Sequence, residues 1–248
     1  MNAEDLARIK ENLEYYRGSL NRCHKIIEES GDNPLGTVTS SMQDEYRAIA
    51  VYQGVVEGEW NLFPEFMASS VECWLNLLAK YSNEGTVCCS MVDVIPAYKC
   101  SLDALAAGNE ALSKQVANEI QQRCDYLSHR FSCYFAFAVK SVTLESDDVS
   151  ERLEALDIEC KTKDGVYFQG HAQVLRCIAE HNEAPLSEAF KLLLKGHRKL
   201  SRGAGMFNLT VDVYLSVWGL GLANLCHFRG LTVEIDDPLI PKQLLLQT

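Results

Sequence analysis

The sequence predicts an all-α protein of about nine or ten helices, packed as antiparallel hairpins in a single domain over residues 1–248. Apolar residues recur at steps of three and four along most of the chain. Signals typical of strands, such as Asn-Gly turns and long runs of β-branched residues, are nearly absent. Short loops separate the expected helices, so a stack of such hairpins would resemble an α-solenoid, although no repeat has a fixed period.

The first part of the chain contains three clearly delimited helices. The first is long and amphipathic, and it stops at the Gly and Pro of residues 30–34. A capping box at residues 41–45 predicts the start of the second helix, which runs to about Glu57. Pro64 suits the first position of the third helix, which ends at residues 83–85. The apolar stripe of the first helix comprises Leu6, Ile9, Leu13, Tyr16, Leu20, Cys23 and Ile27.

The middle of the chain predicts three more helices. Ser90 and Asp93 indicate the start of a fourth helix, and a long fifth helix carries Leu112 through Leu127. Residues 131–139 are apolar on all sides, which is typical of a helix at the centre of a fold.

The last hundred residues predict four further helices and an irregular tail. Asp147 begins an acidic helix, residues 174–178 mark the apolar face of the next, and Pro185 precedes a third. The last long helix covers about residues 211–229 and is closed by a glycine. The tail is expected to hold a short extended piece and then a final turn after Pro241.

The composition is acidic, since 34 acidic and 23 basic residues give a formal net charge of −11. This charge argues against a nucleic-acid-binding protein, because contacts with phosphates need a basic face. It also disfavours docking on anionic membranes. A large negative field suits a basic protein partner, whose approach it would accelerate. The same charge also helps solubility, which requires no partner.

The chain predicts a cytoplasmic protein. Its first residues alternate charged and apolar side chains, unlike a secretory signal. The apolar run at residues 211–228 approaches the length of a membrane span, but Asp212 and Asn224 favour a buried core helix. The ten cysteines are scattered without a Cys-x-x-Cys pair, as expected of reduced thiols. The oligomeric state stays open.

No catalytic or metal-binding constellation is recognisable. His24 and His227 each follow a cysteine, but adjacent helical residues point about 100° apart and do not readily share an ion. Zinc-protease, nucleophile-elbow and phosphate-loop motifs are absent. Cys88 and Cys89 have no neighbouring His or Lys that would lower a thiol pKa, so their pair is expected to be structural. We expect no catalytic residue, no metal and no cofactor.

The tryptophans mark helix faces rather than a cofactor site. Trp74 and Trp218 lie within apolar patterns and are expected to anchor the core. Trp60 lies between two expected helices, where it either joins the core or forms an exposed anchor for a partner.

Residues 211–246 carry a resemblance to a known family. They comprise an apolar helix with small residues, then Arg229–Leu231, an acidic extended piece, and Asp237–Pro241 before a leucine-rich end. This sequence resembles the C-terminal end of the immunity protein 49 family of bacterial polymorphic-toxin systems. Residues 105–109 and the succession of predicted helices are also compatible with that family. The resemblance implies a protein that binds a cognate toxin and blocks its active site or substrate access. Toxins of such systems include nucleases and deaminases.

The leading hypothesis is therefore an immunity protein that inhibits an antibacterial toxin by stoichiometric binding. The expected partner is a cognate toxin domain with a basic surface, and no direct contact with nucleic acid or membrane is expected. The candidate contact residues are Asp147, Asp148, Glu151 and Glu154. Helical spacing would place Asp147, Glu151 and Glu154 on one face.

Two alternatives remain open. A non-catalytic helical scaffold or adaptor would use the same fold to bind a protein or a peptide in a groove. An all-α enzyme with dispersed catalytic residues is less favoured, although motif analysis of one sequence does not reveal such sites. A pocket with several perturbed carboxylates or a bound metal would support the enzyme.

Overall fold

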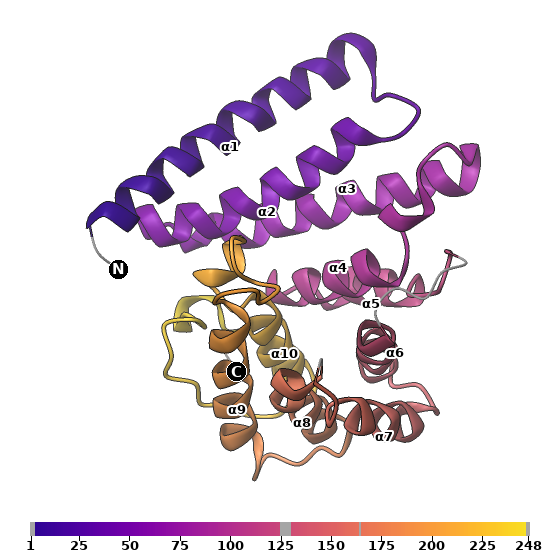
Figure 1. Cartoon of the computed structure of the whole chain (residues 1–248), viewed down its shortest axis with the longest axis vertical. Helices are drawn as coiled ribbons and strands as arrows, with labels where there is room; N and C mark the ends of the chain where they lie inside the picture. The colour runs from indigo at the N-terminus through magenta and orange to yellow at the C-terminus, as the bar shows by residue number, and fades with distance from the viewer. Residues whose placement is uncertain (1–2, 125–129, 164, 247–248) are drawn as a thin grey trace. The chain divides into compact units, whose positions relative to one another are not determined.

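The computed structural model describes residues 3–124, 130–163 and 165–246 (Figure 1). In these ranges the chain forms ten α-helices, five short 3-10 helices and no β-strand, apart from one isolated bridge between Asp237 and Ile240. The predicted all-α class and the predicted number of helices are therefore confirmed. Within the same ranges, no helix combines the length and the apolar character that crossing a membrane requires.

The contacts within the chain define two compact units, residues 1–92 and residues 93–248. Each unit is described by itself, and the single domain over residues 1–248 stays a prediction. The first unit contains three long helices that run up and down as two antiparallel hairpins (Figure 1). They are α1 (Ala3–Ser30), α2 (Thr37–Glu57) and α3 (Phe63–Glu84), with short 3-10 helices at Trp60–Leu62 and Cys89–Met91.

The core of the first unit confirms the predicted apolar stripe of α1. Ile9 and Leu13 are completely buried against the neighbouring helices. Trp74 of α3 is also buried, and its indole N–H donates to the carbonyl oxygen of Met91 at 3.1 Å. Trp60 packs over the bare backbone of Gly54, where a Cβ atom would lie 2.1 Å from the indole ring. This contact favours a packing role for Trp60 over an exposed anchor.

The predicted start of α2 is wrong by five residues, because the preceding loop supplies the polar groups that begin the helix. Asn33 Oδ1 accepts from the backbone N–H groups of Leu35 and Thr37, at 3.0 and 3.2 Å. Asp32 Oδ1 accepts from the N–H of Val38 at 3.1 Å. These bonds satisfy N–H groups in the first turn of the helix, so the predicted capping box at residues 41–45 lies inside the helix and not at its start.

The second unit contains the remaining seven α-helices. Helices α4 and α10 pack closely because Gly221 has no side chain: a Cβ atom there would lie 2.5 Å from the carbonyl oxygen of Leu102. The helices are α4 (Val94–Ala106), α5 (Glu110–Asn118), α6 (Arg130–Leu144), α7 (Val149–Glu159), α8 (Gln169–Ala179), α9 (Leu186–Leu200) and α10 (Val217–Phe228).

Two helices of this unit are shorter than predicted. The fifth helix ends at Asn118, because the backbone N–H of Arg123 turns away to donate to Asp93 Oδ1 at 2.7 Å. Leu127, which we expected in that helix, lies outside the described residues. The last helix begins at Val217 and not at Val211.

The late start of α10 has a local cause. Thr210 Oγ1 accepts from the N–H of Asp212 at 3.2 Å and begins a separate 3-10 turn over Val211–Val213. The carbonyl oxygen of Asp212 then accepts from Nε2 of buried His197 at 2.7 Å. These bonds hold residues 210–213 apart from the helix that follows.

An aromatic cluster fills the centre of the second unit, as predicted for Trp218 and residues 131–139. Trp218 contacts the rings of Tyr98, Phe135 and Phe207 at centroid distances of 5.3, 5.9 and 5.0 Å. His171 lies against the rings of Phe135, Phe168 and Trp218 with no exposed surface, and neither of its ring nitrogens has a hydrogen-bond partner among the described residues. Burial, together with the nearby His197, lowers the pKa of His171 to about 3.

His171 makes the fold sensitive to acid. An unfolded histidine takes up a proton near pH 6.5, whereas folded His171 does so only near pH 3, so its contribution to stability is complete above pH 6.5 and is lost as the pH falls. We expect the free energy of unfolding to drop by about 2 kcal/mol between pH 7 and pH 5 from this group alone. Urea unfolding at the two pH values measures the drop.

The matched variants are His171→Phe and His181→Asn. His171→Phe should remove most of this pH dependence, whereas the exposed His181→Asn should keep it. An equal pH dependence in wild type and His171→Phe would contradict the assignment.

Candidate functional site

The predicted contact residues lie around the start of α7, and the structure exposes three of the four. Asp147 lies in the turn before the helix, while Glu151 and Glu154 lie on α7 itself, all with exposed side chains. Because α7 begins at Val149, the predicted common helical face holds for Glu151 and Glu154 only. Asp147 approaches them from the turn.

Asp148 has a different role from its neighbours. It is half-buried at the N-cap position, where its carboxylate accepts from Arg152 Nε and from the hydroxyl of Ser141, both at 2.8 Å. Arg152 and Ser141 hold the pKa of this carboxyl below its ordinary value. Asp148 thus links the end of α6 to the start of α7, and its charge is already compensated inside the chain.

A small pocket of about 300 Å³ lies beside this acidic turn, and Arg176 and Arg229 contribute to its wall. Both guanidinium groups are already paired. Arg176 pairs with Asp157 and Glu180, and Arg229 Nη1 donates to a carboxylate oxygen of Glu110 at 2.7 Å. The pocket therefore offers exposed carboxylates rather than available cations.

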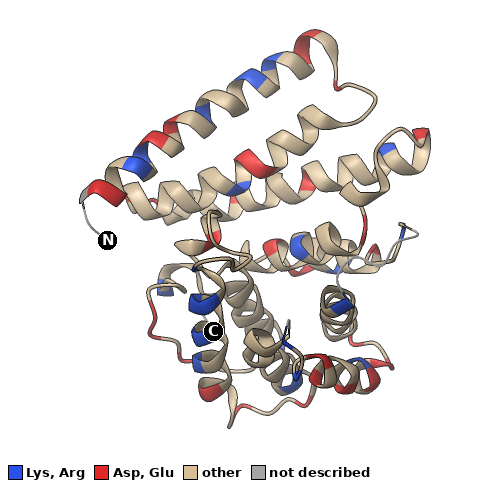
Figure 2. Ribbon diagram, in the orientation of Figure 1, with Lys and Arg blue, Asp and Glu red and all other residues tan. Residues whose placement is uncertain are grey.

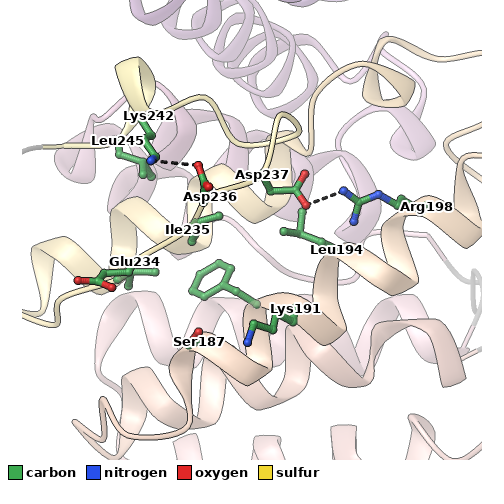
Figure 3. Close-up of a pocket in the computed structure, with 12 residues that line it drawn as sticks. Ser187, Lys191, Leu194, Arg198, Glu234, Ile235, Asp236, Asp237, Lys242 and Leu245 are labelled. Carbon is green, nitrogen blue, oxygen red and sulfur yellow. Dashed lines mark hydrogen bonds and ion pairs between the residues drawn. The ribbon is translucent and has the colours of Figure 1, made fainter. Parts of the chain in front are cut away.

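A larger groove of about 880 Å³ lies between α9 and the chain that follows α10 (Figure 3). Phe190 and Leu194 of α9 and Ile235 of the opposite wall form its apolar lining, and each is almost completely buried. The sequence predicts both walls as separate elements but not the groove, because the walls are some forty residues apart in the chain. The other lining residues are Ser187, Lys191, Arg198, Val233, Glu234, Asp236, Asp237, Lys242 and Leu245.

Ion pairs neutralise most of the charges at the groove. Figure 3 shows Arg198 paired with Asp237 at 2.5 Å and Lys242 paired with Asp236 at 3.0 Å. Lys191 pairs with Glu188 on α9 at 2.6 Å.

Glu234 differs from these residues, because it makes no ion pair with any residue that the structure describes. Its side chain is exposed. The groove therefore has one carboxylate available for an external cation.

Charge is unevenly distributed over the helices. Figure 2 shows acidic residues along α7 and basic residues along α9, whose sequences hold four acidic against one basic and four basic against one acidic residue. Residues 1–92 contain fourteen acidic and seven basic residues. Most of the net negative charge of the chain therefore belongs to the first unit and not to the predicted contact residues.

The cysteines and histidines form no recognisable ligand set among the described residues. Among the described residues, no group of three His, Cys, Asp or Glu side chains is arranged to hold a metal ion. All ten cysteines are free, and seven of them are buried. Cys88 is exposed, and its sulfur lies 3.1 Å from the hydroxyl of Ser90, a contact that lowers the pKa of the thiol. A structural role for the Cys88–Cys89 pair stays a prediction.

No protein-family model, no curated protein and no solved structure matches this chain. The resemblance of residues 211–246 to the immunity protein 49 family therefore stays a prediction.

The position of Asp148 yields a stability prediction. Replacing Asp148 by Asn removes the charge that binds Arg152, and we expect the free energy of unfolding to fall by about 1 kcal/mol. The neighbouring Asp147→Asn, at an exposed turn position, should change it by less than about 0.5 kcal/mol. Urea denaturation at pH 7 compares the two, and equal effects would argue against a structural role for Asp148.

Proposed function

We propose that this chain is an immunity protein that binds a cognate antibacterial toxin and blocks its active site. The observation that carries the proposal is the surplus of acidic residues on a helical framework, with a formal net charge of −11. A toxin that cleaves or modifies nucleic acid must present a basic face to phosphates. An acidic protein can occupy that face and approach it rapidly, because opposite charges steer the encounter.

Two surfaces support binding of this kind. Asp147, Glu151 and Glu154 offer exposed carboxylates at the start of α7. The first unit contributes most of the long-range field, since its acidic residues outnumber its basic residues two to one. We assign close contact to the α7 residues and steering to the first unit.

Inhibition of this type needs no reaction by the immunity protein. Stoichiometric binding excludes the substrate from the toxin, so the chain needs only a rigid surface of the right shape and charge. The resemblance of residues 211–246 points to the same role. A toxin that attacks nucleic acids would meet this protein in the cytoplasm, where we propose it acts.

A scaffold or adaptor is the second candidate, and the groove beside α9 favours it. A groove of about 880 Å³ with an apolar lining from Phe190, Leu194 and Ile235 suits the binding of a peptide segment. An adaptor would bind a partner there without inhibiting it. The two candidates therefore differ in the consequence of binding and not in the fold they require.

Co-expression with the toxin domain encoded by the neighbouring gene tests the proposal. We expect growth to be restored by the wild-type protein. Binding without rescue would favour the adaptor, and absence of binding would refute the immunity role.

A charge-reversal pair tests the contact surface. The double variant Glu151→Lys/Glu154→Lys should slow association with that toxin domain about tenfold at low salt, with a smaller effect at high salt. Glu28→Lys/Glu29→Lys makes the same change of net charge at exposed positions of the first unit and should slow association much less. Stopped-flow or surface-binding kinetics measure the rates, and equal effects of the two changes would exclude α7 as the contact.

A further inference from the structure

Residues 231–236 have the side-chain pattern of a β-strand but belong to no sheet. Leu231 and Ile235 are buried, Val233 is half-buried, and Thr232, Glu234 and Asp236 are exposed. This alternation has the period of two that an extended strand produces. β-branched residues at three of the six positions fit the same geometry.

The segment is held at its ends and not in its middle. The N–H of Thr232 donates to Glu183 Oε1 at 2.7 Å, and at the other end the carbonyl oxygen of Leu239 accepts from the N–H of Ser216 at 2.8 Å. Between them, the backbone groups of residues 233–236 make no hydrogen bond with any part of the chain that the structure describes. Such a row of unpaired N–H and C=O groups is a template for an added strand.

The unpaired segment lines the groove. Glu183 immediately precedes α9, and Asp237 pairs with Arg198 near the end of α9, so the segment runs alongside that helix. In an extended strand, the N–H and C=O groups of residues two apart point to the same side. Because the N–H of Thr232 donates to Glu183, an extended course through residues 232–236 would direct the same groups of Glu234 and Asp236 toward the α9 side, where the groove lies.

We infer that the groove binds an extended segment of the partner protein, which pairs with residues 232–236 as an added β-strand and places a Lys or Arg opposite Glu234. In this pairing, the partner's side chains opposite Val233 and Ile235 contact the apolar lining of the groove. The partner's side chain opposite Glu234 lies on the same, solvent-exposed face as Glu234. Glu234 has no ion pair within the described chain, so its charge selects a cation. Only one part of this inference rests on the proposed function, namely that the partner which supplies the extended segment is the toxin.

A synthetic peptide tests the groove without the toxin. The probe is an acetylated seven-residue peptide of alternating Lys and Val, titrated into the ¹⁵N-labelled full chain and followed by NMR. We expect saturable shifts confined to residues 187–198 and 231–245, with a Kd on the order of 1 mM or tighter. The same peptide with alternate amides N-methylated should bind about tenfold more weakly or worse, because it keeps its side chains but loses strand pairing.

Two substitutions at one exposed position separate backbone pairing from charge. Glu234→Pro removes the N–H on the groove side and should weaken peptide binding about tenfold. Glu234→Gln keeps that N–H, so it should weaken binding only about two- to threefold, with a loss that shrinks at high salt. A peptide with Glu in place of Lys should not bind.

Several results would overturn the inference. These are absence of shifts at the groove, equal binding of the N-methylated peptide, wild-type affinity in Glu234→Pro, or equal binding of the Glu peptide. Shifts of residues 231–236 that depend on protein concentration without peptide would assign the groove to a second copy of this chain. Rescue from the toxin that persists in Glu234→Pro would refute toxin binding at the groove while leaving the immunity role intact. If the peptide binds but the wild-type protein does not rescue growth, the immunity role would be refuted and the groove would keep its role as a binding site for an extended peptide.

Discussion

The amide of Asn224 holds the second unit in the arrangement that forms the groove. This side chain is completely buried on α10, where its Nδ2 donates to the carbonyl oxygens of Leu105 and Ala106 at the end of α4, at 3.0 and 3.3 Å. Its Oδ1 accepts from the N–H of Leu246 at 3.2 Å. One polar group therefore joins two packed helices to the C-terminal tail, and a buried amide tolerates few other arrangements because unsatisfied polar atoms are costly.

Hydrogen bonds hold the chain after α10 at three residues, and the segment between the first two of them, Thr232 and Leu239, lines the groove. Asn224 holds Leu246, Ser216 holds Leu239, and Glu183 holds Thr232. The aromatic cluster around Trp218 sets the position of α10 beneath them. Among the described residues, the backbone groups of residues 233–236 make no hydrogen bond, which is the feature that the proposed docking edge requires.

In the proposed complex, charge and shape would contribute to binding through different parts of the chain. The first unit has the larger acidic excess and supplies a long-range field, which acts on the rate of encounter. The start of α7 and the groove beside α9 offer shorter-range contacts of two kinds, carboxylates in the first case and an apolar lining with a backbone edge in the second. Electrostatic contacts chiefly set specificity and rate, whereas buried apolar anchors set how long a complex lasts.

Local patterns predicted the helices well and their boundaries less well. The stripe of α1, the central helix at residues 131–139 and the final turn after Pro241 follow from side-chain periodicity and from Gly and Pro, which act over a few residues. The starts of α2 and α10 were missed because side chains of the preceding loops bond to nearby backbone groups, and the end of the fifth helix because a side chain bonds to a distant one. The carboxylate of Asp93 accepts from the backbone N–H of Arg123, thirty residues away. It therefore binds the loop that follows α5 and does not cap α4, the helix that it precedes.

The candidate sites show the same division. The sequence by itself determined the all-α class, the acidic charge and the exposed carboxylates at the start of α7, because composition and periodicity depend on residue types and short spacings. Only the tertiary structure decided that Asp148 is neutralised by Ser141 and Arg152, and that residues 231–236 lie unpaired beside α9. The physical reason is that hydrogen-bond satisfaction and cavity shape depend on which distant segments meet, and those meetings are selected by packing of the whole unit rather than by any local pattern.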